Sequence, residues 1–346
     1  MQISALRERL RALGAKTQQE RLFVEAFVRG KTPDESAERG HARFPAALRD
    51  ELPVLQAELS RTASILSEHP GEDGSARLLV RLADGQEVES VLLLRDGVCV
   101  STQVGCAVGC VFCMTGKSGL IRQLTDMEIV AQVALARRMR KVRRVVFMGM
   151  GEPAHNLDAV MSAITLLGTE GGLGHKNLVF STVGDRRVFE RLPQGPVKPA
   201  LAISLHTTKA QLREELLPRA PRIAPEELVA LAQDYSRTVG YPIQYQYTLL
   251  EGINDGDDEL EALERLLRGQ YAVMNFIPYN SVEGMPWRRP GLERAREMAR
   301  YLHSRGILTK LRRSAGQDVD GGCGQLRARA AHLRTSRRKG GDDKQG

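Results

Sequence analysis

Three cysteines lie within eight residues in a chain of 346 residues that has five cysteines in all. They are Cys106, Cys110 and Cys113. Thiolates spaced this closely can direct their sulfur atoms to a common centre, as ligands of a metal ion or an iron–sulfur cluster do. A structural zinc site needs four ligands, and the next candidates downstream are His155 and His175. The segment favours a cluster that leaves one iron open, while a zinc loop and three unrelated thiols remain alternatives.

The spacing of these cysteines, with Phe112 before the last one, resembles the signature of radical S-adenosylmethionine (SAM) enzymes. Two further cysteines lie outside the segment. Cys323 is flanked by Gly321, Gly322 and Gly324, and such a loop favours an exposed, reactive thiol. Cys99 lies on an expected strand just before the clustered cysteines, where an inert, buried thiol is the ordinary interpretation.

Alternating strands and helices must position these thiols. Apolar residues recur every second residue from Leu78, and Asp84-Gly85 predicts a turn, so we expect a β-hairpin linker over residues 76–97. A strand at 98–103 then leads to the cysteines. Thr125 and Glu128 form a capping box that predicts a helix start. Beyond it we expect helices at 125–141, 157–167, 225–238, 257–267 and 292–304, and strands at 145–148, 178–181, 201–204, 243–249, 273–277 and 308–311.

Repeated strand–helix units of this kind predict a parallel α/β sheet. No G-x-G-x-x-G follows the first strand, which disfavours a dinucleotide-binding fold. About six units are too few for a full eight-fold barrel. The sequence therefore predicts a partial (βα)6 barrel over residues 98–326, with a short irregular crossover between the strands at 178–181 and 201–204.

Residues 1–70 predict a small helical accessory domain. Leu6, Leu10 and Leu13 have helical spacing, a second helix is expected over 21–28, and one or two more over 45–66, interrupted at Pro53. A linker is expected at 69–74. The last twenty residues, 327–346, lack apolar periodicity and predict a disordered tail.

The net charge of +8 is unevenly distributed. The tail holds seven Lys and Arg against two Asp, and a second run without acids comprises Arg137, Arg138, Arg140, Lys141, Arg143 and Arg144. Such runs suit the phosphates of RNA, although a solvated helix face and a soluble tail remain the alternative. No apolar run is long enough to span a membrane and no signal sequence is evident, so we expect a cytoplasmic protein that does not bind membranes.

Polar residues follow several expected strands, where the active sites of βα barrels lie. Around a cluster-bound SAM, glycines 149 and 151 would let the backbone approach the ligand, and Glu152 would face its ammonium group. Short polar side chains suit the ribose hydroxyls, carboxylate and adenine edges. The predicted SAM-binding residues are Gly151, Glu152, Ser181, Ser204, Leu205, His206 and Asn280.

Five separated motifs, in order from about residue 88 to residue 326, resemble the RlmN/Cfr family of radical SAM RNA adenine C-methyltransferases. They are Cys99-Val-Ser-Thr-Gln-Val-Gly-Cys106, Met148-Gly-Met-Gly-Glu152, Ser204-Leu-His206, Gly252-Ile-Asn-Asp255 and the segment from Gly316 to Gln325 around Cys323-Gly-Gln. Three places depart from the family pattern: Gly321-Gly322 stand where alanines are usual, and Arg312–Gly316 and Asp185–Arg187 also differ.

The resemblance implies a [4Fe-4S] cluster on Cys106, Cys110 and Cys113, and an S-methylcysteine intermediate on Cys323. One SAM methylates Cys323, a second generates the radical that activates the S-methyl group, and the methylene carbon adds to an adenine ring carbon. Glu89 matches the family's proton acceptor. Release of the RNA would come from attack by Cys99, which forms a transient disulfide with Cys323.

The implied substrates are large-subunit ribosomal RNA and transfer RNA, with carbon 2 of adenine favoured over carbon 8. An electron donor such as flavodoxin or ferredoxin is implied, and we expect a monomer. Two other functions remain open. A radical SAM enzyme with another substrate would not need Cys99 or Cys323, and a basic RNA-binding protein with a structural metal loop would not cleave SAM.

Overall fold

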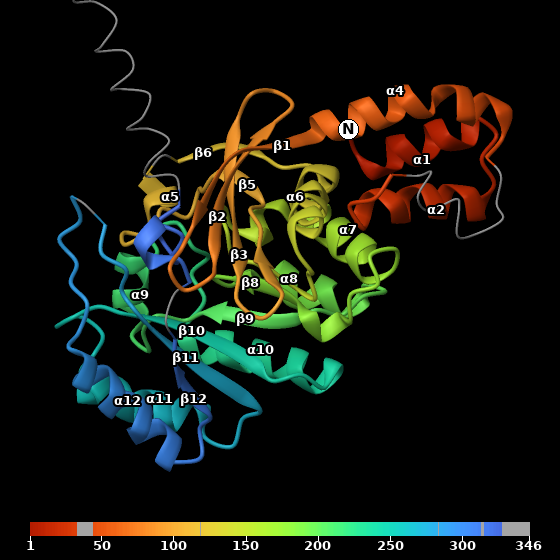
Figure 1. The fold of residues 1–346 in the computed structure, drawn as a ribbon. Helices are drawn as coiled ribbons and strands as arrows, with labels where there is room; N and C mark the ends of the chain where they lie inside the picture. Colours follow the sequence, from red (N-terminus) through yellow and green to blue (C-terminus); the bar gives the residue numbers. More distant parts are fainter. Residues whose placement is uncertain (33–43, 118, 283, 313–314, 327–346) are drawn as a thin grey trace, which may run out of the picture.

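The computed structural model describes residues 1–32, 44–117, 119–282, 284–312 and 315–326. Within these residues, ten strands form one mixed sheet in the order β1-β2-β3-β4-β7-β8-β9-β10-β11-β12 (Figure 1). The strands from β1 to β4 pair antiparallel, and every pair from β4 to β12 is parallel. The predicted strand–helix alternation is therefore confirmed.

The antiparallel part of the sheet comprises β1 (Ala63–Pro70), β2 (Ala76–Leu82) and β3 (Glu87–Leu93). The parallel part comprises β4 (Gly97–Cys99), β7 (Arg144–Phe147), β8 (Leu178–Thr182), β9 (Ala200–Ser204), β10 (Ile243–Leu249), β11 (Ala272–Pro278) and β12 (Thr309–Leu311). A separate two-stranded sheet joins β5 (Gln103–Gly105) to β6 (Leu120–Gln123).

Each parallel strand from β4 to β11 is followed by a crossover that contains a helix. The crossover helices are α6 (Asp126–Met139), α7 (Leu157–Gly168), α8 (Arg186–Arg191), α9 (Ala210–Leu216), α10 (Pro225–Val239), α11 (Asp257–Leu267) and α12 (Leu292–Ser304). Short α5 (Met114–Lys117) lies between β5 and β6. Six strand–helix–strand units result, as the partial (βα)6 barrel requires.

Three local expectations were wrong. The crossover between β8 and β9 contains α8 and is not irregular. Pro53 lies inside one continuous helix, α4 (Ala46–Thr62), because Leu48, Leu52, Leu55 and Leu59 bury one face of it. Residues 63–70, expected as helix and linker, form β1 instead, since pairing with β2 satisfies their backbone groups.

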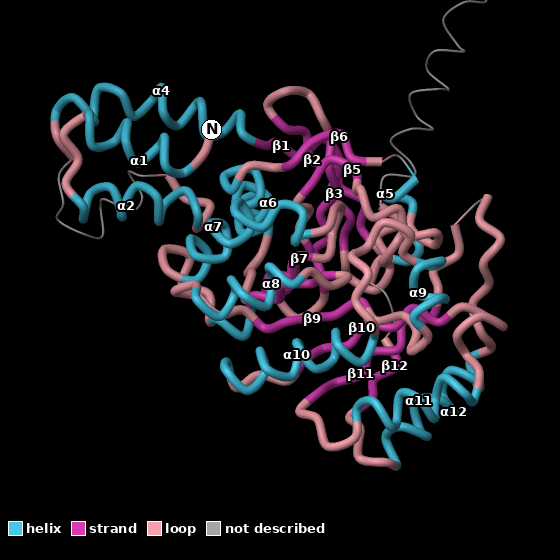
Figure 2. Tube along the Cα trace, turned by 180° about the vertical axis from the view of Figure 1, so that it is seen from behind, coloured by secondary structure: helices cyan, strands magenta, loops and turns pink. Residues whose placement is uncertain are grey.

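The helices α1 (Ile3–Ala12) and α2 (Thr17–Val28) pack with α4 beside α6 and α7, away from α11 and α12 (Figures 1 and 2). The predicted helical module is therefore present, although its proposed boundary at residue 70 stays a prediction. No helix in the described ranges is long and apolar enough to cross a membrane. The predicted tail, 327–346, lies outside the described residues.

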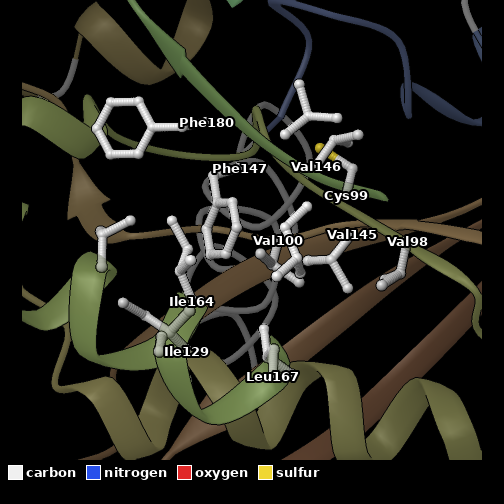
Figure 3. Close-up of a cluster of buried hydrophobic side chains, with 14 of the residues drawn as sticks. Val98, Cys99, Val100, Ile129, Val145, Val146, Phe147, Ile164, Leu167 and Phe180 are labelled. Atoms are coloured by element: carbon white, nitrogen blue, oxygen red, sulfur yellow. The ribbon is translucent and has the colours of Figure 1, made fainter. Parts of the chain in front are cut away.

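The core beneath the first parallel strands is apolar on the side that faces α6 and α7 (Figure 3). Val98 and Val145 are register partners on β4 and β7, and both are fully buried. Ile129 of α6 and Ile164 of α7 cover them. Because side chains alternate along a strand, Cys99 and Val146, the next register pair, lie on the opposite face of the sheet.

Candidate active site

The three clustered cysteines lie on one loop, residues 106–113, which we call the cluster loop. It leaves β5, and α5 and β6 return the chain beside it. The Cys106 amide donates to the carbonyl of Gly119 at 3.0 Å, and the Cys113 amide donates to the carbonyl of Cys110 at 3.0 Å. Gly109 has a φ of 69°, which a side chain would disfavour. The loop is therefore a tight, hydrogen-bonded turn.

Apolar side chains enclose the cluster loop. Its amide at Val111 donates to Leu216 of α9 at 3.1 Å, and the Trp287 indole donates to the carbonyl of Val111 at 3.0 Å. The buried members of this apolar group are Cys106, Val108, Phe112, Val183, Leu216, Leu217, Leu250 and Tyr279. Such surroundings limit the access of water to whatever the thiols bind.

The three thiols influence one another electrostatically. Burial, followed by the charges of Glu152 and Cys113, raises the pKa of Cys106 to about 12. Burial also raises the pKa of Cys110, followed by the charges of Cys113 and Cys106. The charge of Cys113 thus acts on both of the other thiols, so the three lie around a common volume.

This donor set fits an iron–sulfur cluster. In the described part of the chain, no three Cys, His, Asp or Glu side chains converge on one point as ligands of a single metal ion would. Each cysteine of a cluster binds a different iron atom, so its ligands need only surround a common volume. Neighbouring thiols in an apolar enclosure meet that requirement, and Cys106, Cys110 and Cys113 would be the ligands.

Arg213 brings a buried positive charge to the same volume. It is 4% exposed, and its guanidinium donates to the carbonyl of Ser204 at 3.3 Å and to that of Val183. Burial lowers its pKa to about 10, while the charges of Cys110 and Glu152 oppose the shift. Among the described residues it makes no ion pair, and its Nε has no hydrogen-bond partner. Its nearest negative charges are therefore those of the cluster loop and Glu152.

Glu152 follows β7 and is buried beside the cluster loop. Its carboxylate accepts hydrogen bonds from the amides of Ala154 and Val183, both at 3.0 Å. Burial raises its pKa to about 7, partly offset by the hydroxyl of Thr182. At Gly151, with a φ of 102°, a Cβ would lie 2.6 Å from that of Gln103, so only glycine fits. Glu152 can therefore meet a cationic group close to the cluster loop.

His206 follows β9 in a strained conformation with a φ of 63°. Its Nδ1 accepts from the Thr248 amide at 3.0 Å, and burial, followed by the charge of Arg213, lowers its pKa to about 3. The ring is therefore neutral with its proton on Nε2. It stands edge-on to Phe112 of the cluster loop, with 5.0 Å between the ring centroids. Leu205 and Ser181 are also buried here.

Residues 316–326, which we call the carrier loop, lie against the cluster loop. The Met114 amide, directly after Cys113, donates to the carbonyl of Gly324 at 2.8 Å. Asn280 donates from Nδ2 to the carbonyl of Cys323 at 3.0 Å and accepts from Gln317 at 2.8 Å. Cys323 is exposed by surface area. Loss of solvation and the charge of Cys113 raise the pKa of its thiol, and the charge of Arg312 opposes the shift. The structure thus brings Cys323 to the predicted cluster loop.

Cys99 lies on the sheet face opposite the α6 core (Figure 3). Burial raises its pKa, and the charge of Cys323 raises it further, so the two thiols are neighbours although they are 224 residues apart in sequence. Both are free thiols in the structure. The disulfide that the resemblance implies is transient and stays a prediction.

Glu89 is buried on β3. It forms an ion pair with Arg77 of β2, and Ser101 donates to its backbone carbonyl at 2.6 Å. Sequence reasoning missed Arg77. The signal that could have found it is a basic residue within an apolar strand. Arg77 pairs in register with Val91, two residues from Glu89 on the opposite strand of the hairpin.

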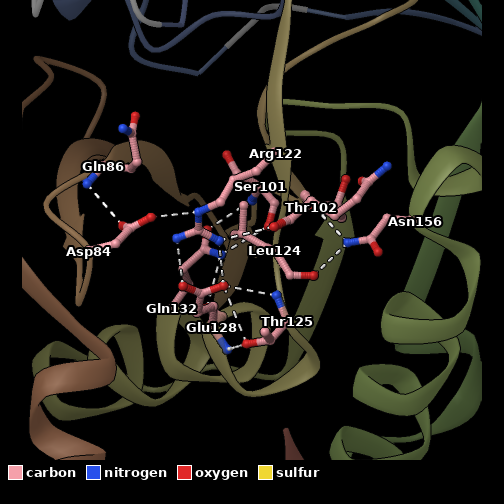
Figure 4. A network of polar contacts seen from close by, with 11 residues as sticks. Asp84, Gln86, Ser101, Thr102, Arg122, Leu124, Thr125, Glu128, Gln132 and Asn156 are labelled. Atoms are coloured by element: carbon pink, nitrogen blue, oxygen red, sulfur yellow. Dashed lines mark hydrogen bonds and ion pairs between the residues drawn. The ribbon is translucent and has the colours of Figure 1, made fainter. Parts of the chain in front are cut away.

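A polar network supports the chain that enters the cluster loop (Figure 4). Gln132 of α6 bonds to both the amide and the carbonyl of Ser101 at 2.9 Å. Arg122 of β6 bridges Asp84 at 2.7 Å and Glu128 at 2.8 Å. Glu128 also closes the predicted capping box with Thr125. Arg122 on β6, which flanks the cluster loop, therefore links the start of α6 to the turn between β2 and β3.

Half of the basic run at 137–144 is partly buried, namely Arg137, Arg140 and Arg144, whereas Arg138, Lys141 and Arg143 are exposed. Arg137 donates to the carbonyls of Val28 at 3.0 Å and Gly171 at 2.9 Å, Arg138 donates to Gly30, and Arg140 donates to Gly74 and Leu93. These bonds attach the helical module and the β-hairpin to α6. RNA binding by these three arginines, one of two sequence interpretations, is therefore not favoured.

Known proteins resemble this chain over most of its length. The model of the radical SAM superfamily matches residues 100–266. A protein named "Probable RNA methyltransferase" from Methylibium petroleiphilum is 68% identical over 330 residues, which cover 95% of this chain and 94% of that protein. One from Azoarcus sp. is 65% identical over 333 residues, covering 96% of each. The crystal structure of a radical SAM methyltransferase from Sphaerobacter thermophilus has a TM-score of 0.81 and 36% identity, covering 95% of this chain and 98% of that one.

Proposed function

Because this chain belongs to the family of radical SAM RNA methyltransferases, we propose that it methylates a ring carbon of an adenine in RNA through an S-methylcysteine at Cys323. The observation that carries the proposal is the contact between the carrier loop and the cluster loop. This contact supports the proposal because it brings the loop of Cys323 against the loop that would hold the cluster, and the charge of Cys323 acts on a second thiol, Cys99. A radical SAM enzyme with another substrate would have no use for this pair.

The cluster and SAM, when bound, supply the methyl group for Cys323 and the adenosyl radical that removes one of its hydrogens. The chain's own residues hold these groups. Glu152 would accept from the methionine ammonium, and the Nε2–H of His206 would donate to an oxygen of SAM. Ser181, Ser204, Leu205, Gly151 and Asn280 complete the proposed SAM-binding set, which lies at or just beyond the carboxyl ends of β7, β8, β9 and β11.

Cys323 would carry the methylene carbon, as a radical, to the ring carbon of the adenine. The adduct would then lose one electron, which returns to the oxidised cluster, and Glu89 would accept the proton from the ring carbon. Cys99 then attacks the sulfur of Cys323, and the bond between that sulfur and the methylene carbon breaks. The electron pair stays on carbon, which takes up a proton and becomes the methyl group. Cys99 and Cys323 are left as a disulfide that an external thiol must reduce.

The substrate class rests on the relatives, whose names specify RNA. We propose large-subunit ribosomal RNA, transfer RNA or both, with carbon 2 of adenine as the acceptor in preference to carbon 8. A flavodoxin or ferredoxin would supply the electron, and the enzyme would act in the cytoplasm as a monomer.

Mass spectrometry of nucleosides tests this function. Ribosomal and transfer RNA from a deletion strain should lack a C-methyladenosine that is present in the parent. Complementation with the wild-type gene should restore it, whereas Cys323→Ala should not. An unchanged methyladenosine profile in both RNA classes would show that the substrate lies elsewhere. Restoration by Cys323→Ala would refute the S-methylcysteine pathway.

A further inference from the structure

Arg77 and Glu89 share one face of the antiparallel hairpin. Arg77 pairs in register with Val91, and Val91 pairs with Cys99 on the next strand. Glu89 is two residues from Val91, so its side chain points to the same side and lies diagonally opposite Arg77. The geometry therefore places Arg77, Glu89 and Cys99 on one side of the sheet, with Cys323 as a neighbour of Cys99.

The pair is deeply buried. Arg77 is 2% exposed and Glu89 is 1% exposed, and Nη1 of Arg77 donates to Oε1 of Glu89. Removing a carboxylate from water favours its neutral form, whereas a hydrogen-bonded cation favours the ionised form. A buried carboxyl group can accept a proton only if it is ionised before the reaction. A neighbouring guanidinium can favour the ionised form, since guanidinium groups remain charged under all ordinary conditions.

Arg77 also reaches the carrier loop. Its Nε donates to the carbonyl of Val319 at 2.7 Å, and a Cβ on Gly321 would lie 3.6 Å from that of Arg77. One guanidinium therefore bonds both to Glu89 and to the loop that holds Cys323. This arrangement fixes the position of the proton acceptor relative to the methyl carrier.

The remaining nitrogen, Nη2 of Arg77, is buried and has no hydrogen-bond partner among the described residues. An unused buried donor costs free energy, so a residue kept only for packing would be expected to satisfy it. The spare donor indicates that stability alone does not explain Arg77.

We propose that Arg77 is a positioning residue for the methyl transfer: it keeps Glu89 ionised in a buried site and fixes Glu89 relative to the carrier loop. The inference rests on the proposed function, in which Glu89 accepts the proton. The other charged groups on this face are Arg81 and Glu87, which pair with each other at 3.3 Å, and those near the carrier loop, which are Asp73, Arg312 and Asp320.

The test compares Arg77→Gln and Arg77→Lys with the reconstituted wild-type enzyme on its RNA substrate, across pH. Arg77→Gln should move the acidic limb of the rate profile to higher pH and lower the rate at least tenfold near pH 6, with partial recovery at alkaline pH. Arg77→Lys, which keeps the charge, should retain the wild-type profile at a reduced rate. Difference infrared spectra against Glu89→Gln should show an ionised carboxylate in the wild type at pH 6, and its loss in Arg77→Gln.

Methylation of Cys323, measured by intact mass after incubation with SAM and no RNA, separates this role from a structural one. Glu89 has no part in that step, so Arg77→Gln should retain it. A pH-independent loss of both methylation and turnover would mean that Arg77 merely supports the carrier loop, and would overturn the proposal. Asp73→Asn, which weakens the Asp73–Gly316 bond of 3.2 Å without touching Glu89, is the matched control for that outcome.

Two further results separate a failure of the role inferred for Arg77 from a failure of the role proposed for Glu89. If Glu89→Gln is inactive but Arg77→Gln has the wild-type rate and profile, Arg77 does not act through Glu89 and the inference fails, while the proposed function stands. If Glu89→Gln turns over normally, Glu89 is not the proton acceptor, and that part of the proposed function fails together with the inference.

Discussion

Asn280 donates a hydrogen bond from its side-chain amide to the carbonyl oxygen of Cys323 at 3.0 Å. The sequence predicted Asn280 as a ligand of SAM. In the structure, the same side chain holds the loop that carries the reactive thiol. Asn280 thus belongs to the proposed SAM site and also bonds to the loop of the proposed methyl carrier, so a change at the end of β11 should alter the geometry of both.

A first prediction concerns the glycine before Cys323. A Cβ at Gly322 would lie 2.6 Å from Oε1 of Gln325 and 2.7 Å from Nδ2 of Asn280. Gly322→Ala should therefore displace Asn280 and lower the rate of Cys323 methylation, measured by intact mass. Gly321→Ala is the matched control, because its nearest atom would be 3.3 Å away. Equal rates in the two variants would contradict this account.

A second prediction concerns release of the product. Cys99→Ala leaves no thiol to attack the sulfur of Cys323, so enzyme purified from cells should carry covalently bound RNA. Denaturing gels with and without ribonuclease will detect it. Cys99→Ala combined with Cys323→Ala should be free of RNA. If Cys99→Ala is free of RNA and makes product at the normal rate, Cys99 has no role in release.

The third prediction concerns the cluster loop. Anaerobic reconstitution should yield about four irons and four sulfides per chain. Cys106→Ala should lose most of this iron together with the visible absorbance. Cys99→Ala should retain both, since Cys99 lies outside the loop. Bound zinc with no visible absorbance in the wild type would contradict the assignment of the cluster.

Arg213 leads to a fourth prediction. Its buried charge lies near Cys110 and makes no ion pair within the described residues. A positive charge close to an iron–sulfur cluster stabilises the reduced, more negative state. Arg213→Gln should therefore lower the midpoint potential, measured by redox titration with electron paramagnetic resonance, and Arg213→Lys should lower it less. An unchanged potential in Arg213→Gln would remove Arg213 from this role.

A fifth prediction concerns acid stability of the helical module. Glu20 is 3% exposed and accepts from Arg7 at 2.6 Å and Arg11 at 2.7 Å. Burial raises its pKa, but the hydrogen bonds from Arg11 and Arg7 outweigh this, so the net pKa is lowered. The stabilisation is present above the unfolded-state pKa of 4.5 and is lost as the pH falls through the lower folded-state value.

Glu20→Gln should therefore be destabilised by about 1–3 kcal/mol at pH 7. It should also lose less stability than the wild type as the pH falls below about 4.5. Thermal unfolding of both proteins between neutral and acidic pH measures the difference. Glu8→Gln is a suitable control, because Glu8 lies on α1 of the same helical module and is exposed. Parallel acid profiles for the wild type and Glu20→Gln would contradict the prediction.

Local signals predicted the barrel well. The capping box of Thr125 and Glu128 marks the start of α6, and Pro225 marks that of α10, because both act within one helical turn. The cysteine spacing located the cluster loop for the same reason. Non-local pairing could not be deduced. Residues 63–70 form β1 only because β2 lies beside them, and Arg77 acquires its importance from Glu89 and Val319.

The helix α4 runs directly into β1, with Thr62 ending one element and Ala63 beginning the other. The helical module is therefore continuous with the outermost strand of the sheet, with no linker between α4 and β1. A deletion at residue 70, the boundary expected from sequence, would strip the outermost strand and leave β2 with unpaired backbone groups. Exposed edges of this kind recruit other chains. Shortening the gene there would yield an aggregating fragment, whereas swapping α1 and α2 alone between relatives would keep the sheet intact.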